Sequence, residues 1–272
     1  MKRSIPLLGA ALCTALLTAC ATAPSGRGQM LLYSDAQMNQ LGSASFDRLK
    51  SEGSIASEPR REAYVRCVVN ALVAQLPDQW RKTAWEVQVF KDDSANAFAL
   101  PGGKVGVNTG MFSVAANADQ LAAVLGHEIG HVVFRHSNER VSTAAMTEAG
   151  LGMVNAYVGA RATAQTSSAV MSALGLGAQV GVLLPFSRKH ESEADVFGQR
   201  LMAQAGFDPA QAVALWQNMS KQSSASRPLP WLSTHPDPSQ RIARLQAQVA
   251  TLATVSARAR EQGLRPNCAL RR

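Results

Sequence analysis

The sequence HEIGH at residues 127–131 places two histidines four positions apart, with a glutamate directly after the first. Apolar residues precede and follow it, which predicts a buried helix. Side chains four residues apart on a helix project from the same face, so the imidazoles of His127 and His131 can bind one metal ion with Glu128 beside them. The alternative is a pair of structural histidines that are hydrogen-bonded to the backbone.

A second segment, HESEAD at residues 190–195, offers further ligand chemistry. A catalytic zinc ion usually takes three protein ligands, so one more is needed. Glu191 and Asp195 are four residues apart and share a helix face, whereas Glu193 points to the other side. We therefore expect Glu191 to be the third ligand and Asp195 to orient the imidazole of His127. Glu193 is expected to be solvated.

The remaining histidines carry weaker signals. His235 precedes a proline in the sequence STHP, and taken alone it is typical of a cap or a turn. His136 and His190 are expected to be structural or exposed. The sequence contains no G-x-S-x-G motif that would indicate a serine nucleophile.

Elements that position these residues are predicted from periodicity and capping. Helical spacing occurs at residues 30–50 and 62–76, and alternation predicts strands at 85–89 and 104–108. Residues 101–103 (PGG) should form a tight turn.

The chain that follows is predicted to be largely helical. Asp119 is the expected N-cap of the helix that bears HEIGH and ends near Arg135, and a second helix should span residues 188–205 and close at Gly206. Two more should begin at the Asp-Pro pairs 208–209 and 237–238. The predicted fold class is α+β, mainly helical with a small sheet.

Residues 162–187 contain no charged residue. Their scattered polar residues and glycines favour a buried or membrane-facing helix with a mobile loop over a membrane span.

The N-terminus has the pattern of a secretory signal. Two basic residues precede the apolar stretch 5–17, and the sequence LTAC at 17–20 is similar to a bacterial lipobox. Residues 1–19 are therefore expected to be removed and Cys20 to carry lipid, with ordinary cleavage and a free thiol as the alternative. The absence of Asp after Cys20 favours the outer membrane. Residues 21–29 are expected to be a flexible tether.

Cys13 would be removed with the signal and Cys20 would carry lipid, so Cys67 and Cys268 remain as a pair in an oxidising compartment. We expect a disulfide between them. Two unpaired buried thiols are the alternative. The formal net charge is +8, or +6 once Lys2 and Arg3 are subtracted with the signal, and residues 241–272 contain seven arginines against one glutamate. This tail favours anionic lipid headgroups or a solvated helix face, and without aromatic interleaving it does not indicate nucleic-acid binding.

Three ordered motifs carry a family resemblance: NAFALPGGKVGVNTG at 96–110, HEIGHVVFRHS at 127–137 and ESEADVFGQRLMAQAGFDP at 191–209. Over about residues 60–250 the chain resembles the zinc metallopeptidase family that contains the CAAX prenyl proteases and the Oma-type and HtpX proteases. It looks most like the small periplasmic lipoprotein members. The resemblance implies a zincin-like metallopeptidase domain at residues 60–272, after a tether and N-terminal helix at 20–59.

The resemblance also implies roles for single residues. It assigns zinc to the two HEIGH histidines and Glu191, one ion per chain, and it assigns catalysis to Glu128. A late His-Pro motif makes His235 either the oxyanion stabiliser or an extra ligand that plugs the zinc in a latent state. Arg241 matches an arginine that would orient His235 or the transition state, with solvent exposure as the alternative.

The expected function is that of a lipid-anchored zinc endopeptidase on the periplasmic face of the bacterial outer membrane. Its substrates would be misfolded or stalled envelope proteins, paired as extended chains with an edge strand that includes Asn96, Ala97, Phe98 and Ala99. The outer-membrane assembly machinery is a further candidate partner. The alternative is a chaperone-like assembly factor in which zinc is mainly structural.

Overall fold

The structure, a computed structural model, describes residues 20–145, 187–225, 231–232, 235 and 238–270. Its three-stranded sheet has the order β3 (Glu86–Phe90), β5 (Lys104–Asn108), β4 (Ala97–Leu100). β5 runs parallel to β3 and antiparallel to β4. The two strands predicted from alternation are confirmed, and the chain turns between β4 and β5 at Gly102 and Gly103, which both have positive φ.

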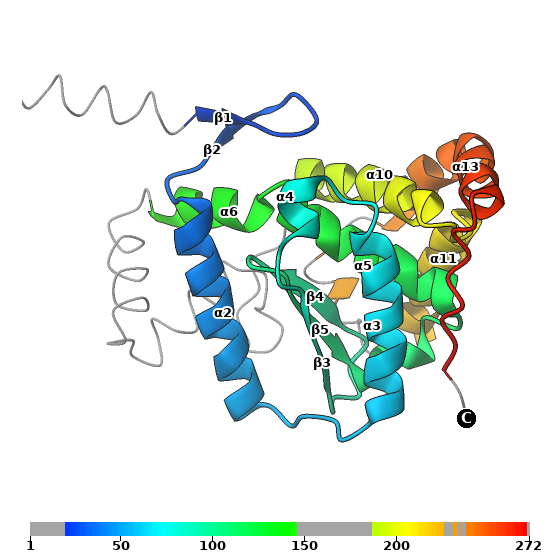
Figure 1. Ribbon diagram of the computed structural model, residues 1–272, viewed down its shortest axis with the longest axis horizontal. Coiled ribbons are helices and arrows are strands. Elements are labelled where there is room, and N and C mark those ends of the chain that lie inside the picture. The colour runs from blue at the N-terminus through cyan, green and yellow to red at the C-terminus, as the bar shows by residue number, and fades with distance from the viewer. Residues whose placement is uncertain (1–19, 146–186, 226–230, 233–234, 236–237, 271–272) are drawn as a thin grey trace, which may run out of the picture.

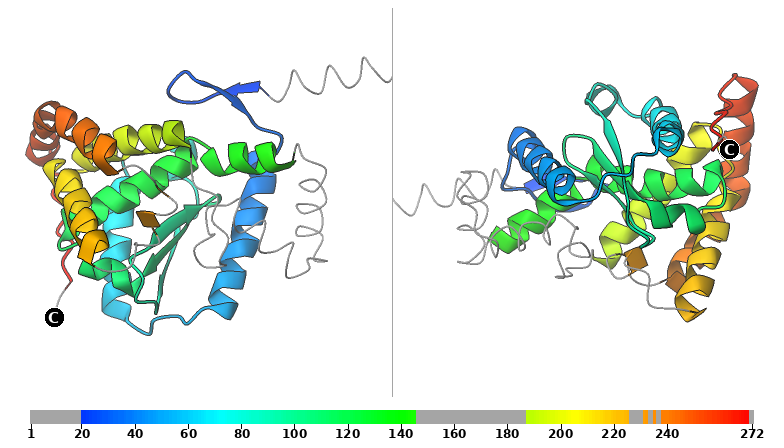
Figure 2. Two further views of the ribbon diagram at one scale, coloured as in Figure 1. Left: turned by 180° about the vertical axis from the view of Figure 1, so that it is seen from behind. Right: turned by 90° about the horizontal axis from the view of Figure 1, so that it is seen from below.

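Helices surround the sheet, and α2 and α13 lie at opposite ends of the molecule (Figures 1 and 2). The longer helices are α2 (Asp35–Glu52), α3 (Pro59–Val73), α5 (Ala118–Val133), α10 (Arg188–Gln204), α11 (Ala210–Ala225) and α13 (Pro238–Glu261). The shorter ones are α4 (Asp78–Arg81), the 3-10 helix η1 (Thr109–Ser113) and α6 (His136–Ala145). The mainly helical α+β class is therefore confirmed.

α5 is the central helix, and every residue from 120 to 133 is buried. Its N-cap is Asn117, whose side chain accepts from the Gln120 amide. The prediction of Asp119 as the cap is wrong, because the Asp119 carboxylate instead accepts from the Asp208 backbone amide at 2.7 Å. The helix ends two residues before the predicted Arg135, which has a φ of 54° and begins the turn into α6.

α5 and α10 cross at glycines. A Cβ added to Gly198 would lie 2.6 Å from the backbone nitrogen of His127, and one added to Gly126 would lie 2.9 Å from the Gly198 carbonyl oxygen. Side chains at these two positions would force the helices apart. The close crossing brings the acidic residues of α10 next to the histidines of α5.

The N-terminal segment is a hairpin, so the prediction of a flexible tether at residues 21–29 is wrong. β1 (Cys20–Thr22) pairs antiparallel with β2 (Gly28–Met30). The side chain of Gln29 is buried and donates to the Phe134 carbonyl at 2.7 Å. Ion pairs of Arg27 add to this contact, and composition alone does not reveal such partners.

A disulfide joins Cys67 of α3 to Cys268, across 201 residues and a Cα–Cα distance of 5.7 Å. The pairing agrees with the sequence prediction. In the chain-entropy account, closing so long a loop stabilises the fold by about 5 kcal/mol.

Some predictions fall outside the described residues: the signal peptide at 1–19, the side chain of Cys20, and all of the uncharged segment 162–187 except Ser187. Within the described ranges, no helix is both long and apolar enough to cross a bilayer.

Candidate metal centre

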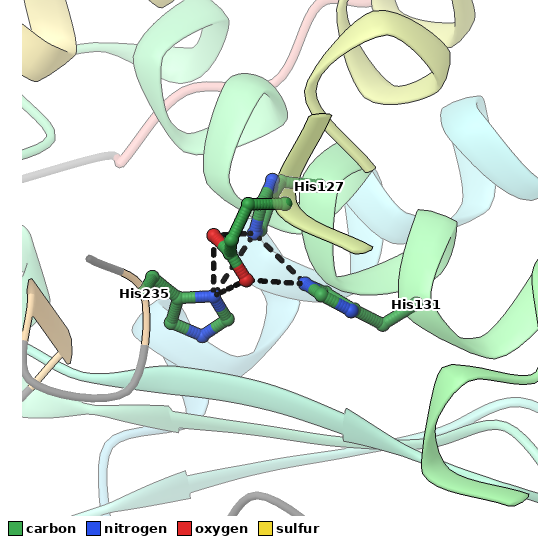
Figure 3. Close-up of side chains that lie close together, drawn as sticks. His127, His131 and His235 are labelled. Carbon is green, nitrogen blue, oxygen red and sulfur yellow. Dashed lines mark hydrogen bonds and ion pairs between the residues drawn. The ribbon is translucent and has the colours of Figure 1, made fainter. Parts of the chain in front are cut away.

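Four buried side chains converge between α5, α10 and the segment before α13. His127 and His131 project from one face of α5, Glu191 comes from the first turn of α10, and His235 completes the group (Figure 3). Their ligand atoms all lie within 4.8 Å of one another, and each residue is at most 3% exposed.

The distances within this group fit a zinc ion. Ideal Zn–N bonds of about 2.0–2.1 Å place the corners of a tetrahedron about 3.3 Å apart. His127 Nε2 lies 3.0 Å from His131 Nε2 and 3.1 Å from His235 Nδ1, and the carboxylate oxygens of Glu191 lie 2.9–3.5 Å from the three ring nitrogens. Zinc suits such a nitrogen-rich set better than magnesium or calcium does.

Hydrogen bonds between the rings do not account for this arrangement. A pair of imidazole nitrogens shares one proton at most, so the three that converge on Glu191 cannot all hydrogen-bond to one another. Burial lowers the pKa of His131 well below its usual value, which keeps the ring neutral and leaves one of its two nitrogens able to bind a metal. A cation at the centre would satisfy all four groups.

Asp195 and Arg241 support the His127 side of the group. Asp195 Oδ1 lies 3.1 Å from His127 Nδ1, the contact expected from the helix spacing. Arg241 is 2% exposed, donates from Nε to Asp195 Oδ2 at 2.8 Å, and also donates to Glu191. The alternative of a solvent-exposed Arg241 is therefore wrong.

Both carboxylates are held in their ionised form. Burial opposes ionisation, but Arg241 and His127 lower the pKa of Asp195, and His235 and Arg241 lower the pKa of Glu191 well below its usual range. An ionised Glu191 is the state that a metal ligand requires.

Glu128 lies against Trp231, which sequence reasoning missed. The indole Nε1 donates to Glu128 Oε1 at 2.8 Å, and the Trp231 ring centroid is 4.7 Å from that of His235. Glu128 is 3% exposed and Trp231 is 1% exposed. The only signal in the sequence is the position of Trp231 four residues before His235, one helical turn away.

The sequence of residues 59–249, which contains all of these residues, matches Peptidase family M48. The chain belongs to this family. It is 42% identical over 163 residues to the mitochondrial metalloendopeptidase OMA1 of Schizosaccharomyces pombe, covering 60% of this chain and 46% of the relative.

Two bacterial relatives are similar over longer stretches. The chain is 32% identical over 219 residues to the putative beta-barrel assembly-enhancing protease of Vibrio cholerae, covering 79% of this chain and 43% of the relative. It is 29% identical over 212 residues to the beta-barrel assembly-enhancing protease of Escherichia coli, covering 76% and 42%. This M48 chain thus spans less than half the length of these three relatives.

A second group of polar residues lies on the His131 side of the metal centre. Glu193 was expected to be solvated, but its side chain is 11% exposed and accepts from His136 Nε2 and from Arg27 Nη2, each at 3.0 Å. Burial opposes ionisation, yet bonds from His136, Arg27 and Ser25 lower the pKa of Glu193 to about 2. The prediction is wrong because the N-terminal hairpin covers this face of α10.

His136 and His190 are both buried, and their rings stack with centroids 4.3 Å apart. Burial lowers both pKa values, that of His190 to about 4. His136 also has a defined place beside the centre, since its Nδ1 lies 2.9 Å from His131 Nδ1.

β4 is an edge strand, as expected. Within the described residues it pairs only with β5, and it packs against α5. Asn96, Ala97, Phe98 and Ala99 are each at most 6% exposed. A substrate role for this strand stays a prediction.

Proposed function

We propose that this chain is a zinc metalloendopeptidase. The observation that carries the proposal is the convergence of His127, His131 and Glu191 on one point, with the carboxylate of Glu128 on the same helix. Membership of a peptidase family supports it, as do relatives whose names describe proteases.

The residues divide the chemistry among them. Bound zinc would supply Lewis-acid chemistry, acidifying a water molecule and polarising the scissile carbonyl. The Glu128 carboxylate would accept the proton of the attacking water and deliver it to the leaving amine. Asp195 would accept the Nδ1 proton of His127 and so leave the Nε2 lone pair for the metal.

His235 could act as an extra metal ligand in a latent enzyme or as the oxyanion stabiliser. The arrangement of the described residues supports the first role. His235 Nδ1 completes a set of four donors, the number that a closed zinc site usually has, and Trp231 donates a hydrogen bond to Glu128. We propose that this is a closed form, and that substrate binding withdraws His235 from the set. In the open form the same imidazole could donate to the oxyanion.

Extended, partly unfolded polypeptides are the proposed substrates. The side of β4 that pairs with no strand among the described residues would add a substrate strand through main-chain hydrogen bonds, which demand little of the substrate sequence. The lipobox-like sequence and the disulfide support a lipid-anchored enzyme at the periplasmic face of the outer membrane. Two relatives named for beta-barrel assembly support envelope proteins, and the assembly machinery, as partners.

A closed set of four protein donors is also typical of structural zinc sites. This observation favours a second candidate function, an assembly factor that holds clients without cleaving them. Glu128 separates the two candidates, because only proteolysis needs a proton acceptor next to the metal.

The test replaces Glu128 with Gln, which keeps the shape of the side chain but cannot accept the proton. We expect zinc to stay at one per chain while cleavage of an unfolded protein is lost. Glu62→Gln, at a partly exposed position on α3, serves as the matched control. Cleavage by Glu128→Gln at the parent rate would overturn the proposal. A parent that binds zinc, never cleaves and still restores the envelope of a deletion strain would establish the second candidate.

A further inference from the structure

The N-terminal hairpin reaches the metal centre through an unbroken chain of polar contacts. Arg27 follows Cys20 by seven residues and precedes the region matched to the family. Its guanidinium donates to both oxygens of Glu139 on α6, at 2.7 and 2.8 Å, and to Glu193 on α10 at 3.0 Å. One side chain of the hairpin thus holds two helices together.

From Glu193 the contacts continue inward. Glu193 Oε2 lies 3.0 Å from His136 Nε2, and His136 Nδ1 lies 2.9 Å from His131 Nδ1. His136 is fully buried. The order Arg27, Glu193, His136, His131 therefore ends on a ring whose other nitrogen faces the metal site.

The direction of each hydrogen bond follows from the last ring. His131 Nε2 must be unprotonated to bind a metal, so its proton is on Nδ1, which donates to His136 Nδ1. His136 must then carry its own proton on Nε2, which donates to Glu193. The carboxylate is a suitable acceptor because it also accepts from the Arg27 guanidinium.

We infer that Arg27, Glu193 and His136 are positioning residues for the metal centre, and that the hairpin is therefore part of the active site. The inference rests on the proposed zinc site. Carboxylates that support a histidine ligand usually contact it directly, as Asp195 contacts His127. Here the carboxylate acts through a second imidazole and depends on a residue that comes more than 160 positions earlier in the chain.

The test measures zinc affinity of the full chain by competition with a chromophoric chelator. Glu193→Ala and Arg27→Met should each weaken zinc binding about 10- to 100-fold while the stoichiometry at saturating zinc stays at one. Arg27→Lys, which keeps the charge, should recover part of the loss. His136→Phe keeps an aromatic ring against His190 but has no nitrogens, and it should match Glu193→Ala.

Two control variants separate positioning from general loss of charge. Glu139→Ala removes the other partner of Arg27 but leaves the contacts from Glu193 to His131, so zinc affinity should stay close to that of the parent. Arg66→Met breaks an exposed ion pair with Glu62 and changes the net charge as Arg27→Met does. It should also bind zinc like the parent.

A second readout does not depend on activity or on metal. Ring ¹⁵N shifts of the zinc-free protein should show the His131 proton on Nδ1 in the parent and divided between both nitrogens in His136→Phe. Parent-like zinc affinity in both Glu193→Ala and Arg27→Met, or the same loss in Glu139→Ala, would overturn the inference. Failure of the proposed function would appear instead in the parent, as absence of zinc or of Glu128-dependent cleavage.

Discussion

Two carboxylates from the same helix support the two histidines of HEIGH, and they do so from opposite sides of the metal centre. Asp195 contacts His127 directly, whereas Glu193 reaches His131 through the ring of His136. The two acidic residues are two positions apart on α10 and therefore face different neighbours. One helix turn thus serves both ligands.

An arginine donates hydrogen bonds to each carboxylate, and the two arginines differ in how deeply they are buried. Arg241 of α13 is 2% exposed and stacks on Trp216, with its guanidinium carbon 3.8 Å from the ring centroid. The side chain of Arg27 in the hairpin is 23% exposed. Solvent can replace part of an exposed ion pair but not a buried one, so removing the arginine should cost more stability on the Arg241 side. The Arg27 side depends on a separate hairpin, so changes there should alter the metal centre at a smaller cost in stability.

The largest effect should come from Arg241→Met. This change leaves the carboxylates of Asp195 and Glu191 buried without their cation, which costs about 3–5 kcal/mol in the free energy of unfolding. Arg27→Met should cost less, since water can replace part of its contacts. Urea unfolding of the zinc-free proteins measures both values, and equal losses would contradict the comparison.

The difference between the sides also explains what the sequence could predict. Asp195 was found because its spacing from Glu191 is fixed by one helix. The role of Glu193 was missed because helix periodicity says which face a residue is on, but not what covers that face. Its partners come from a hairpin that the composition had indicated to be a tether and from His136, which was expected to be structural or exposed.

The same limit applies to the fold. Alternation and capping predicted β3, β5 and the ends of α10, since these signals are local. The start of α5 was misplaced because Asp119 caps nothing locally and instead binds the Asp208 amide, a contact made only in the folded chain. The role of Trp231 was also missed, because a lone aromatic residue in a sequence is more often part of a hydrophobic core.

The next largest effect should come from loss of the hydrogen bond that Trp231 donates to Glu128. Trp231→Phe keeps an aromatic ring but removes the N–H that donates to Glu128. A buried acceptor that loses its donor should cost about 1–3 kcal/mol of stability. Urea unfolding checks the value against Trp80→Phe, a variant of a partly buried tryptophan on α4. A cost no larger than that of the control would show that the hydrogen bond contributes little.

His235→Ala asks whether the closed form restrains activity. If the imidazole holds the fourth position, its loss should raise the rate of peptide cleavage by about tenfold, equivalent to a closed form favoured by about 1.4 kcal/mol. Steady-state cleavage of a short unstructured peptide at saturating zinc measures the change. A fall of about 10²- to 10³-fold would show instead that His235 acts mainly on the transition state.

The smallest effect should be a pH dependence on the Arg27 side. Burial opposes ionisation of Glu139, but Arg27, His190 and Gln29 lower its pKa below the ordinary value. The unfolded chain therefore takes up this proton first as the pH falls, so the stabilisation is present above about pH 4.3 and is lost below it. Because the ion pair is partly exposed, the contribution should be less than about 1 kcal/mol. The unfolding free energies of the parent and of Glu139→Gln should therefore differ at about pH 6, and the difference should shrink as the pH falls below about 4.3. A constant difference as the pH falls would show that Glu139 contributes through packing rather than through charge.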